Sequence, residues 1–254
     1  MHTDRDVVIV GGGVAGLSAA IFTARQELDT LVVDTGNSIL RRNAHLENFP
    51  GFPLGVNARQ LLDLLAEQAE IADADRLADR VTDVSIAASE PAESSDNTDR
   101  PRFVVETAEN VQIRTRSVIA ATKSGGEYLT DIDGVEIRDR GKRYVEVDER
   151  GRTGVPGLYA AGRLAAKPHQ AAVCAGHGAE VAVTLVEDGA VAFYHDWVAP
   201  DGYFTDRGRD VPPGCEEIGA ATRRERERQS RRVMRDRFAE PHPDEQETHP
   251  SVEE

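Results

Sequence analysis

The chain has 254 residues, with 45 acidic and 30 basic side chains and a formal net charge of −15 at pH 7. This length suffices for one large domain or two small ones, and it can bury a core without disulfides or metals. The negative charge argues against nucleic-acid or membrane-surface binding, because the chain's own field repels phosphates. Among the basic residues only Lys123, Lys142 and Lys167 are lysines.

The cysteine pattern favours a reducing compartment. Cys174 and Cys215 lie far apart, and the sequence contains no C-x-x-C motif, so we expect two free thiols and no metal site. The start of the chain does not read as a signal peptide, and the glycines within the uncharged stretch 7–24 argue against a membrane span. We therefore expect a cytoplasmic protein that does not contact membranes.

The most informative stretch is the N-terminal one. An apolar run at residues 7–10 leads into Gly11, Gly13 and Gly16 at G-x-G-x-x-G spacing, and a helix-forming run follows. The next apolar run ends at Asp34. This order of strand, glycine loop, helix, strand and acid predicts a dinucleotide-binding βαβ unit.

Each part of that unit has a physical role. Gly11 allows the tight turn, Gly13 lets a pyrophosphate approach the backbone, and Gly16 lets the helix pack closely on the strand. The helix N-terminus offers free N–H groups and a positive dipole end to the phosphates. The Asp34 carboxylate can accept a hydrogen bond from a ribose hydroxyl.

Hydrophobic periodicity predicts the further elements. Helices are expected at 58–71 and 170–185, and strands at 81–86, 103–107, 110–114, 117–121, 144–148 and 155–162. The connections expected as loops are 41–53, 89–102 and 122–141. Together these elements predict an α/β fold of the Rossmann type, with a parallel sheet and a β-meander crossover.

The composition changes after residue 188, which predicts a domain at 1–188 and a C-terminal extension at 189–254. Within the extension we expect an irregular loop at 194–214, a charged helix at 223–238 and an acidic disordered tail at 242–254. The arginine-rich stretch 223–237 is open to two interpretations: contact with nucleic acid or an acidic partner, or a solvated helix stabilised by its own salt bridges. Interleaved acids favour the second.

Three separated motifs resemble the FAD-binding domain of the low-molecular-weight thioredoxin reductase family. The first is residues 11–16 with Asp34, and the second is the Glu-Asn-Phe-Pro-Gly-Phe segment at 47–52. The third is the Val-Pro-Gly-Leu-Tyr-Ala-Ala-Gly segment at 155–162, followed by 169–172 and 175–178. The resemblance covers residues 5–188. The acidic, lysine-poor composition also resembles that of proteins from salt-loving microbes.

The resemblance implies FAD as the cofactor and assigns residues to it. The glycine motif would hold the pyrophosphate, Asp34 the adenosine ribose, and the Val81 backbone the adenine edge. Asn48 would lie near the flavin, with Gln170 and Ala171 facing its pyrimidine carbonyl from a helix N-terminus. The implied cofactor-binding residues are Gly11, Gly13, Val14, Ala15, Gly16, Asp34, Asn48, Val81, Thr122, Gly162, Arg163, Gln170 and Ala171.

The sequence also departs from that family. Fewer than 35 residues separate Thr122 from the 155–162 motif, where the family carries an NADPH domain with its redox C-x-x-C. Lys123 stands in place of a glycine, Arg163 in place of an aspartate, and His169 in place of an arginine. Direct reduction of thioredoxin is therefore disfavoured, since neither the hydride source nor the dithiol relay is present.

Several residues are open to two interpretations. Arg163 could pair with the pyrophosphate or be solvated. His169 could move protons near the flavin or make one hydrogen bond at the helix start. Cys174 could border the flavin or fill space in a tightly packed helix. His169 and Cys174 are the candidate catalytic residues, and no role is assigned to either.

The sequence thus predicts an FAD-binding oxidoreductase-like flavoprotein, with the flavin reduced by external NAD(P)H or by a redox partner protein. The alternative is a non-catalytic nucleotide-binding or interaction module derived from a reductase. A third hypothesis, an NAD-binding protein without flavin, does not explain the motifs at 155–162 and 170–171. Whether the chain forms a homodimer is left open.

Overall fold

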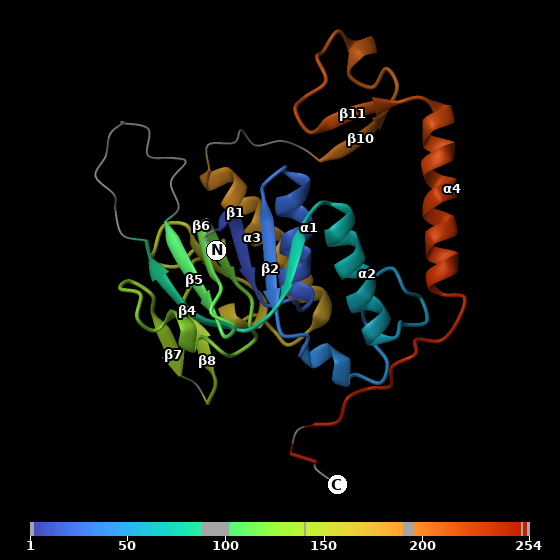
Figure 1. Ribbon diagram of the computed structural model, residues 1–254. Coiled ribbons are helices and arrows are strands. Elements are labelled where there is room, and N and C mark those ends of the chain that lie inside the picture. The colour runs from blue at the N-terminus through green and yellow to red at the C-terminus, as the bar shows by residue number, and fades with distance from the viewer. Residues whose placement is uncertain (1–2, 88–101, 140, 190–195, 250, 253–254) are drawn as a thin grey trace. The chain divides into compact units, whose positions relative to one another are not determined.

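The computed structural model describes residues 3–87, 102–139, 141–189, 196–249 and 251–252 (Figure 1). The chain divides into two compact units, residues 1–190 with 246–254, and residues 191–245. The loop predicted at 89–102 lies outside the described residues except for its last residue. The predicted boundary after residue 188 stays a prediction.

The first unit is built on a seven-stranded sheet with the order β3-β2-β1-β6-β5-β4, in which β9 also pairs with β6. The strands β1, β2, β3, β6 and β9 run parallel, while β4 and β5 run antiparallel to their neighbours. This arrangement confirms the predicted Rossmann-type fold with a β-meander. The bounds are β1 Thr3–Val10, β2 Thr30–Asp34, β3 Asp75–Ala78, β4 Val81–Ile86, β5 Phe103–Thr107, β6 Gln112–Ala120 and β9 Leu158–Ala160.

The two faces of β1 have different partners because successive side chains of a strand point to opposite sides. Val7 and Ile9 are buried against the helices α1 (Val14–Arg25) and α3 (Ala171–Asp188). Val8 and Val10 are buried with side chains of the β-meander and of the crossover before β9. A third helix, α2 (Ala58–Ile71), has the bounds predicted from its periodicity and packs on α1.

Several predicted strands differ from the observed ones. The strands expected at 110–114 and 117–121 form the single strand β6, because β1 pairs with it without interruption. The expected strand 155–162 is ordered as a strand only over β9, and 144–148 is replaced by β8 (Arg143–Val145). β8 pairs with β7 (Ile137–Asp139), which lies inside the predicted connector.

The helix α1 approaches both α3 and the loop after β1 so closely that two glycines are needed. A Cβ on Gly178 would lie 2.0 Å from the carbonyl oxygen of Ala15. A Cβ on Gly16 would lie 1.8 Å from the carbonyl oxygen of Gly11. Both distances are far below van der Waals contact with backbone atoms that cannot move aside alone, so a side chain at either position would separate α1 from its neighbours.

A buried histidine connects α3 to the turn after β9. His177 is only 4% exposed, and its Nδ1 accepts a hydrogen bond of 3.0 Å from the backbone N–H of Gly162. That bond requires a neutral ring with its proton on Nε2, for which no partner is found among the described residues. Desolvation, with a smaller contribution from Lys167, lowers the pKa of His177 from 6.5 to about 4.

The second unit contains a small parallel pair of strands, β10 (Trp197–Pro200) and β11 (Cys215–Ile218). The prediction of an irregular loop at 194–214 is therefore wrong for 197–200, which form β10, while 208–214 contain no helix or strand. Trp197, Tyr203 and Phe204 form an aromatic cluster with edge-to-face ring contacts at centroid distances of 4.7–5.6 Å. Hydrogen bonds and ring contacts between residues close in sequence stabilise this segment, and periodicity does not report them.

The charged helix predicted at 223–238 is present as α4 (Ala220–Arg237), and none of its residues is buried. Its arginines pair with acids of the same unit, including Arg226 with Glu216 and Arg228 with Glu225. These pairs agree with the salt-bridged interpretation. The part of the chain described after residue 240 contains no helix or strand. No helix among the described residues has the length and apolar character needed to cross a membrane.

The packing of α1 on α3 leads to the first testable prediction. Gly178→Ala should lower the free energy of unfolding by about 1–3 kcal/mol, because the new methyl group overlaps the Ala15 carbonyl. The matched control is Gly176→Ala, two residues away on the same helix, where a Cβ meets no atom within 4 Å. The control should be neutral or stabilising by up to about 1 kcal/mol. Urea denaturation of both variants measures this, and equal stabilities would contradict the packing.

His177 leads to a second prediction. The unfolded chain binds the imidazole proton near pH 6.5 and the folded chain only near pH 4, so the unfolded state holds more protons between these values. The stability from neutral His177 is therefore present above pH 6.5 and is lost as the pH falls, by roughly 3 kcal/mol in total.

The measurement is urea denaturation of the wild type and of His177→Gln at several pH values from 7 to 4. The glutamine keeps an acceptor for the Gly162 N–H but does not titrate. We expect the stability difference between the two proteins to shrink, or to reverse in favour of the variant, as the pH falls. Parallel curves would show that His177 does not carry this pH dependence.

Candidate functional site

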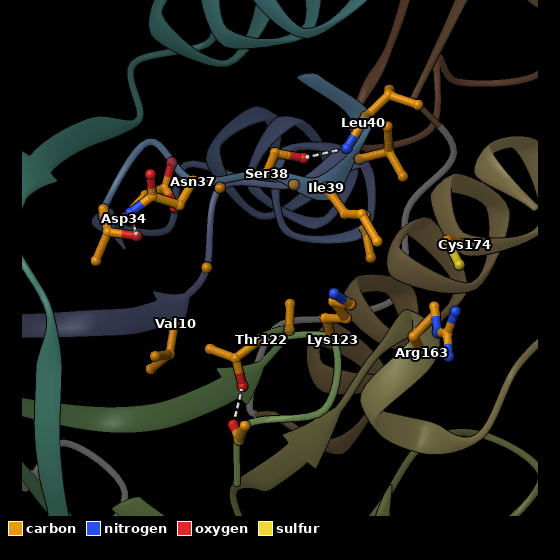
Figure 2. A pocket seen from close by; sticks show the side chains of 18 of the residues that line it. Val10, Asp34, Asn37, Ser38, Ile39, Leu40, Thr122, Lys123, Arg163 and Cys174 are labelled. Carbon is orange, nitrogen blue, oxygen red and sulfur yellow. Dashed lines mark hydrogen bonds between the residues drawn. The ribbon is translucent and has the colours of Figure 1, made fainter. Parts of the chain in front are cut away.

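A cavity of about 710 Å³ opens beyond the carboxyl ends of the central strands (Figure 2). Val10 ends β1, Asp34 ends β2 and Ala121 follows β6, and all three residues line it. Open α/β sheets bind ligands at this edge, and the volume falls within the range of about 300–1,000 Å³ typical of small-molecule sites.

The glycine loop forms the floor of this cavity. Gly11 has φ of +108°, a left-handed conformation that favours glycine, and a Cβ there would lie 2.9 Å from the Ala121 carbonyl oxygen. At Gly12 a Cβ would lie 2.6 Å from Oδ2 of Asp34, so the carboxylate rests directly against the loop. A Cβ on Gly13 would meet only Oγ of Ser38 within 4 Å, at 3.6 Å.

The loop ends at the N-terminus of α1. Gly13 is the N-cap residue, no side chain caps the helix, and its first turn contains no acid. The first N–H groups of α1 and its positive dipole end are therefore available to an anion in the cavity. A glycine cradle beside an uncapped helix N-terminus fits the pyrophosphate of a dinucleotide.

One end of the cavity carries acceptor side chains suited to a ribose and a base. Asp34 lies there with Asn37, on the segment that follows β2 (Figure 2). Val81, at the start of β4, lines the same cavity, as does its neighbour Arg80. Asn37 and Arg80 were not predicted from the sequence, because neither belongs to a spaced motif.

Asn48 and Gln170, which are 122 positions apart, meet in the cavity. Nδ2 of Asn48 donates a hydrogen bond of 2.8 Å to Oε1 of Gln170. Gln170 is the N-cap residue of α3, and its side chain does not cap the helix. The N-terminus of α3, with Ala171 as its first residue, therefore also faces the cavity with its dipole positive.

The loop that carries Asn48 is held by a buried arginine that sequence reasoning missed. Arg59 on α2 is 3% exposed and donates hydrogen bonds of 3.1 and 2.8 Å to the carbonyl oxygens of Arg41 and Asn43. Buried guanidinium groups are stable only when carbonyls or acids satisfy their donors. The apolar residues at helical spacing in α2 identify the buried face of that helix. The same pattern does not reveal the carbonyl groups to which Arg59 donates.

The segment after β6 also lines the cavity. Oγ1 of Thr122 is bonded to the carbonyl of Gly125 and lies 2.9 Å from the Tyr128 hydroxyl. Lys123 has φ of +68°, so the position where the family carries glycine keeps a glycine-like backbone with a lysine side chain. Desolvation lowers the pKa of Lys123, and the charges of Arg42, Arg163 and Lys142 lower it further.

The turn after β9 brings Arg163 to the cavity beside Cys174 (Figure 2). Gly162 itself lies behind the lining, with φ of +63° and a Cβ position 2.8 Å from Cβ of Ala15. Cys174 is 6% exposed, and its Sγ donates a weak hydrogen bond of 3.5 Å to the Pro168 carbonyl oxygen. Burial raises the pKa of the Cys174 thiol, so it stays protonated at neutral pH.

The predicted residues thus meet in one place, although their individual roles stay predictions. Gly16 and Gly162 do not line the cavity and instead allow close packing around α1. The candidate residues that do line it are Gly11, Gly13, Val14, Ala15, Asp34, Asn48, Val81, Thr122, Arg163, His169, Gln170, Ala171 and Cys174.

Comparisons of sequence agree with this geometry. A family model described as an FAD binding domain matches residues 6–42. Thioredoxin reductase from Streptomyces coelicolor is 34% identical over 127 residues, or 49% of this chain and 36% of that protein. The bifunctional thioredoxin reductase/thioredoxin of Mycobacterium leprae is 32% identical over 143 residues, or 55% of this chain and 28% of that protein. The match thus spans about a third of these relatives.

Comparisons of structure agree on the fold. A thioredoxin reductase from Gloeobacter violaceus has a TM-score of 0.61 at 20% identity and covers 76% of this chain and 99% of that chain. The thioredoxin reductase from Streptococcus pyogenes has a TM-score of 0.62 at 12% identity, over 73% of this chain and 98% of that chain. The chain therefore has a Rossmann-type fold, matches an FAD-binding domain model over residues 6–42, and is similar in sequence to part of the thioredoxin reductases.

Proposed function

We propose that FAD lies along the cavity of the first unit and that the chain acts as an oxidoreductase whose electron donor and acceptor come from outside. One observation carries this proposal: the glycine cradle, Asp34 and the Asn48–Gln170 pair all line one continuous cavity. These groups suit the pyrophosphate, the adenosine ribose and the flavin of one extended dinucleotide.

The roles proposed for the residues follow from their chemistry. The backbone N–H groups after Gly13 would donate to the pyrophosphate, and Asp34 would accept from a ribose hydroxyl. The Val81 backbone would meet the adenine edge. Ala15 and Val14, in the first turn of α1, would complete the phosphate site, while Gly16 and Gly162 hold α1 in place.

At the other end of the cavity, FAD supplies hydride and electron transfer when bound. The α3 N-terminus, with Gln170 and Ala171, would favour negative charge on the flavin pyrimidine ring. His169 also lines the cavity, and desolvation together with the charges of Arg163, Lys123 and Lys142 lowers its pKa. A neutral imidazole there can accept a proton from the solvent or a substrate.

The segment that connects β6 to β9 supports the proposal that the electrons come from an external donor. In the described residues this connection consists of a short 3₁₀ helix, Glu127–Leu129, and the β7–β8 hairpin. Cys174 and Cys215 lie far apart in the sequence and do not form a C-x-x-C pair. Neither feature offers a second nucleotide site or a dithiol relay, which favours NAD(P)H from solution or a partner protein as donor.

The setting of this activity is also a proposal. Two cysteines far apart in the sequence, without a C-x-x-C motif, fit a cytoplasmic protein. We propose residues 1–188 as the catalytic domain and 189–254 as an extension whose role is separate from FAD binding, because every residue lining the cavity lies before residue 175. The competing hypothesis is a non-catalytic FAD-binding module, favoured by the missing dithiol.

The proposal predicts a flavin spectrum. The purified full chain, supplied with FAD in high salt, should show the absorbance of bound oxidised flavin, which should bleach on anaerobic addition of NADH or NADPH. A bound flavin that bleaches only with a partner from cell extract also supports an oxidoreductase. A bound flavin that no donor reduces would favour the non-catalytic module. A chain that binds no FAD would overturn the proposal.

Gly13 offers a sharper test of where FAD lies. Gly13→Ala should lower the free energy of unfolding by less than about 1 kcal/mol, because its Cβ finds 3.6 Å of clearance and only the N-cap preference for glycine is lost. The same methyl group should raise the Kd for FAD by about 10- to 100-fold by blocking the pyrophosphate. Gly176→Ala is the control and should bind FAD as the wild type does. Titration of flavin fluorescence measures both, and unchanged affinity in Gly13→Ala would mean that no phosphate passes over this loop.

A further inference from the structure

Cationic side chains gather at one end of the cavity. Lys123 and Arg163 both line it, together with His169, which stays neutral because its pKa is lowered. Figure 2 shows Lys123 and Arg163 on the side that carries Cys174, away from Asp34. The positive charge of Lys142 acts on both Lys123 and His169, and that of Arg42 acts on Lys123. We refer to Lys123 and Arg163 as the cationic cluster.

This cluster is unexpected in a chain with a net charge of −15. Of the three lysines in the whole chain, two, Lys123 and Lys142, contribute positive charge at this end of the cavity. Like charges in a shared, partly desolvated space repel one another, so the arrangement is unfavourable unless an anion joins it. Glu127 also lines the cavity, but its carboxylate pairs with Arg143 at 3.3 Å.

The backbone at Lys123 adds a second observation. Its φ of +68° lies in the left-handed region, where glycine is more favourable than any residue with a Cβ. The cavity therefore keeps an ammonium group at a position whose backbone favours glycine. Strained backbone positions of this kind cluster at binding and active sites.

The FAD pyrophosphate does not account for the cluster. Its proposed cradle is the glycine loop and the N-terminus of α1, which offer N–H groups without any cationic side chain. The cluster comes from other elements, namely the segment after β6 and the turn after β9. Two separate anion-binding arrangements in one cavity indicate two anionic groups.

We propose that the cationic cluster binds the anionic group, phosphate or carboxylate, of the substrate that exchanges electrons with the flavin. This inference rests on the proposed function, since it places that substrate beside the flavin end of the FAD site. Arg163 offers a planar fork of donors to such an anion, and Lys123 offers a mobile ammonium. Phosphates of a nicotinamide dinucleotide and a small carboxylic acid share this chemistry.

The test begins with protein loaded with FAD, confirmed by its absorbance. Inorganic pyrophosphate and pyruvate are titrated separately at fixed ionic strength, and binding is measured by calorimetry and by the shift of the flavin spectrum. Tighter binding of pyrophosphate would point to a dinucleotide substrate, and tighter binding of pyruvate to a carboxylate. Both results support the inference.

Lysine labelling gives a readout that is independent of turnover. Limited acetylation with acetic anhydride followed by peptide mapping reports all three lysines of the chain at once. The bound anion should slow modification of Lys123 by at least about 3-fold while leaving Lys167 unchanged. Equal rates with and without the anion would contradict the cluster as its site.

Single charge changes complete the test. Lys123→Gln and Arg163→Gln should each weaken anion binding by about 3- to 10-fold, with Lys167→Gln as the unchanged control. Lys123→Gly should weaken anion binding equally while relieving the backbone strain at this position.

If FAD binds but neither anion does, this inference fails and the proposed function stands. If the anions displace FAD, the cluster serves the cofactor and the inference is overturned. If FAD never binds, both fail.

Discussion

The rest of the structure depends on the close approach of α1 to β1 and to α3. Only glycine fits at the positions where these elements touch. Gly16 and Gly178 leave no room for a Cβ, and Gly162 leaves little beside Ala15. This contact fixes the N-terminus of α1 over the sheet edge and, through the same helix pair, the start of α3. Both helix N-termini therefore face one cavity, which gives two sites of positive potential along its length.

The cavity is polarised along that length. Asp34 rests against Gly12 at one end, while Lys123 and Arg163 line the other. Such an order matches a ligand that presents hydroxyl groups first, a pyrophosphate next and a ring system last, with an anionic substrate beside the ring. His177 stays neutral within the packed layer, so it adds nothing to the positive potential that the helix N-termini and the cationic side chains give the cavity.

The connection between β6 and β9 limits the chemistry that the chain can perform alone. It forms a small hairpin, and Val145 of that hairpin is buried with Leu164 in the core of the first unit. This hairpin therefore covers a face of the sheet without adding a second nucleotide site. Such an arrangement supports the proposal that electrons enter and leave through molecules that bind from outside, and it assigns the substrate contacts to residues already lining the FAD site.

The sequence by itself determined the fold class, the glycine loop, Asp34 and the bounds of α2, because spacing and periodicity report local geometry directly. It missed β3, whose short polar run is held as a strand by hydrogen bonds to β2. Only the tertiary structure joined Asn48 to Gln170, buried Arg59 under the loop, and gathered Lys123, Arg163 and His169. These contacts link residues far apart in the chain, and their physical basis is desolvation and charge, which no local pattern encodes.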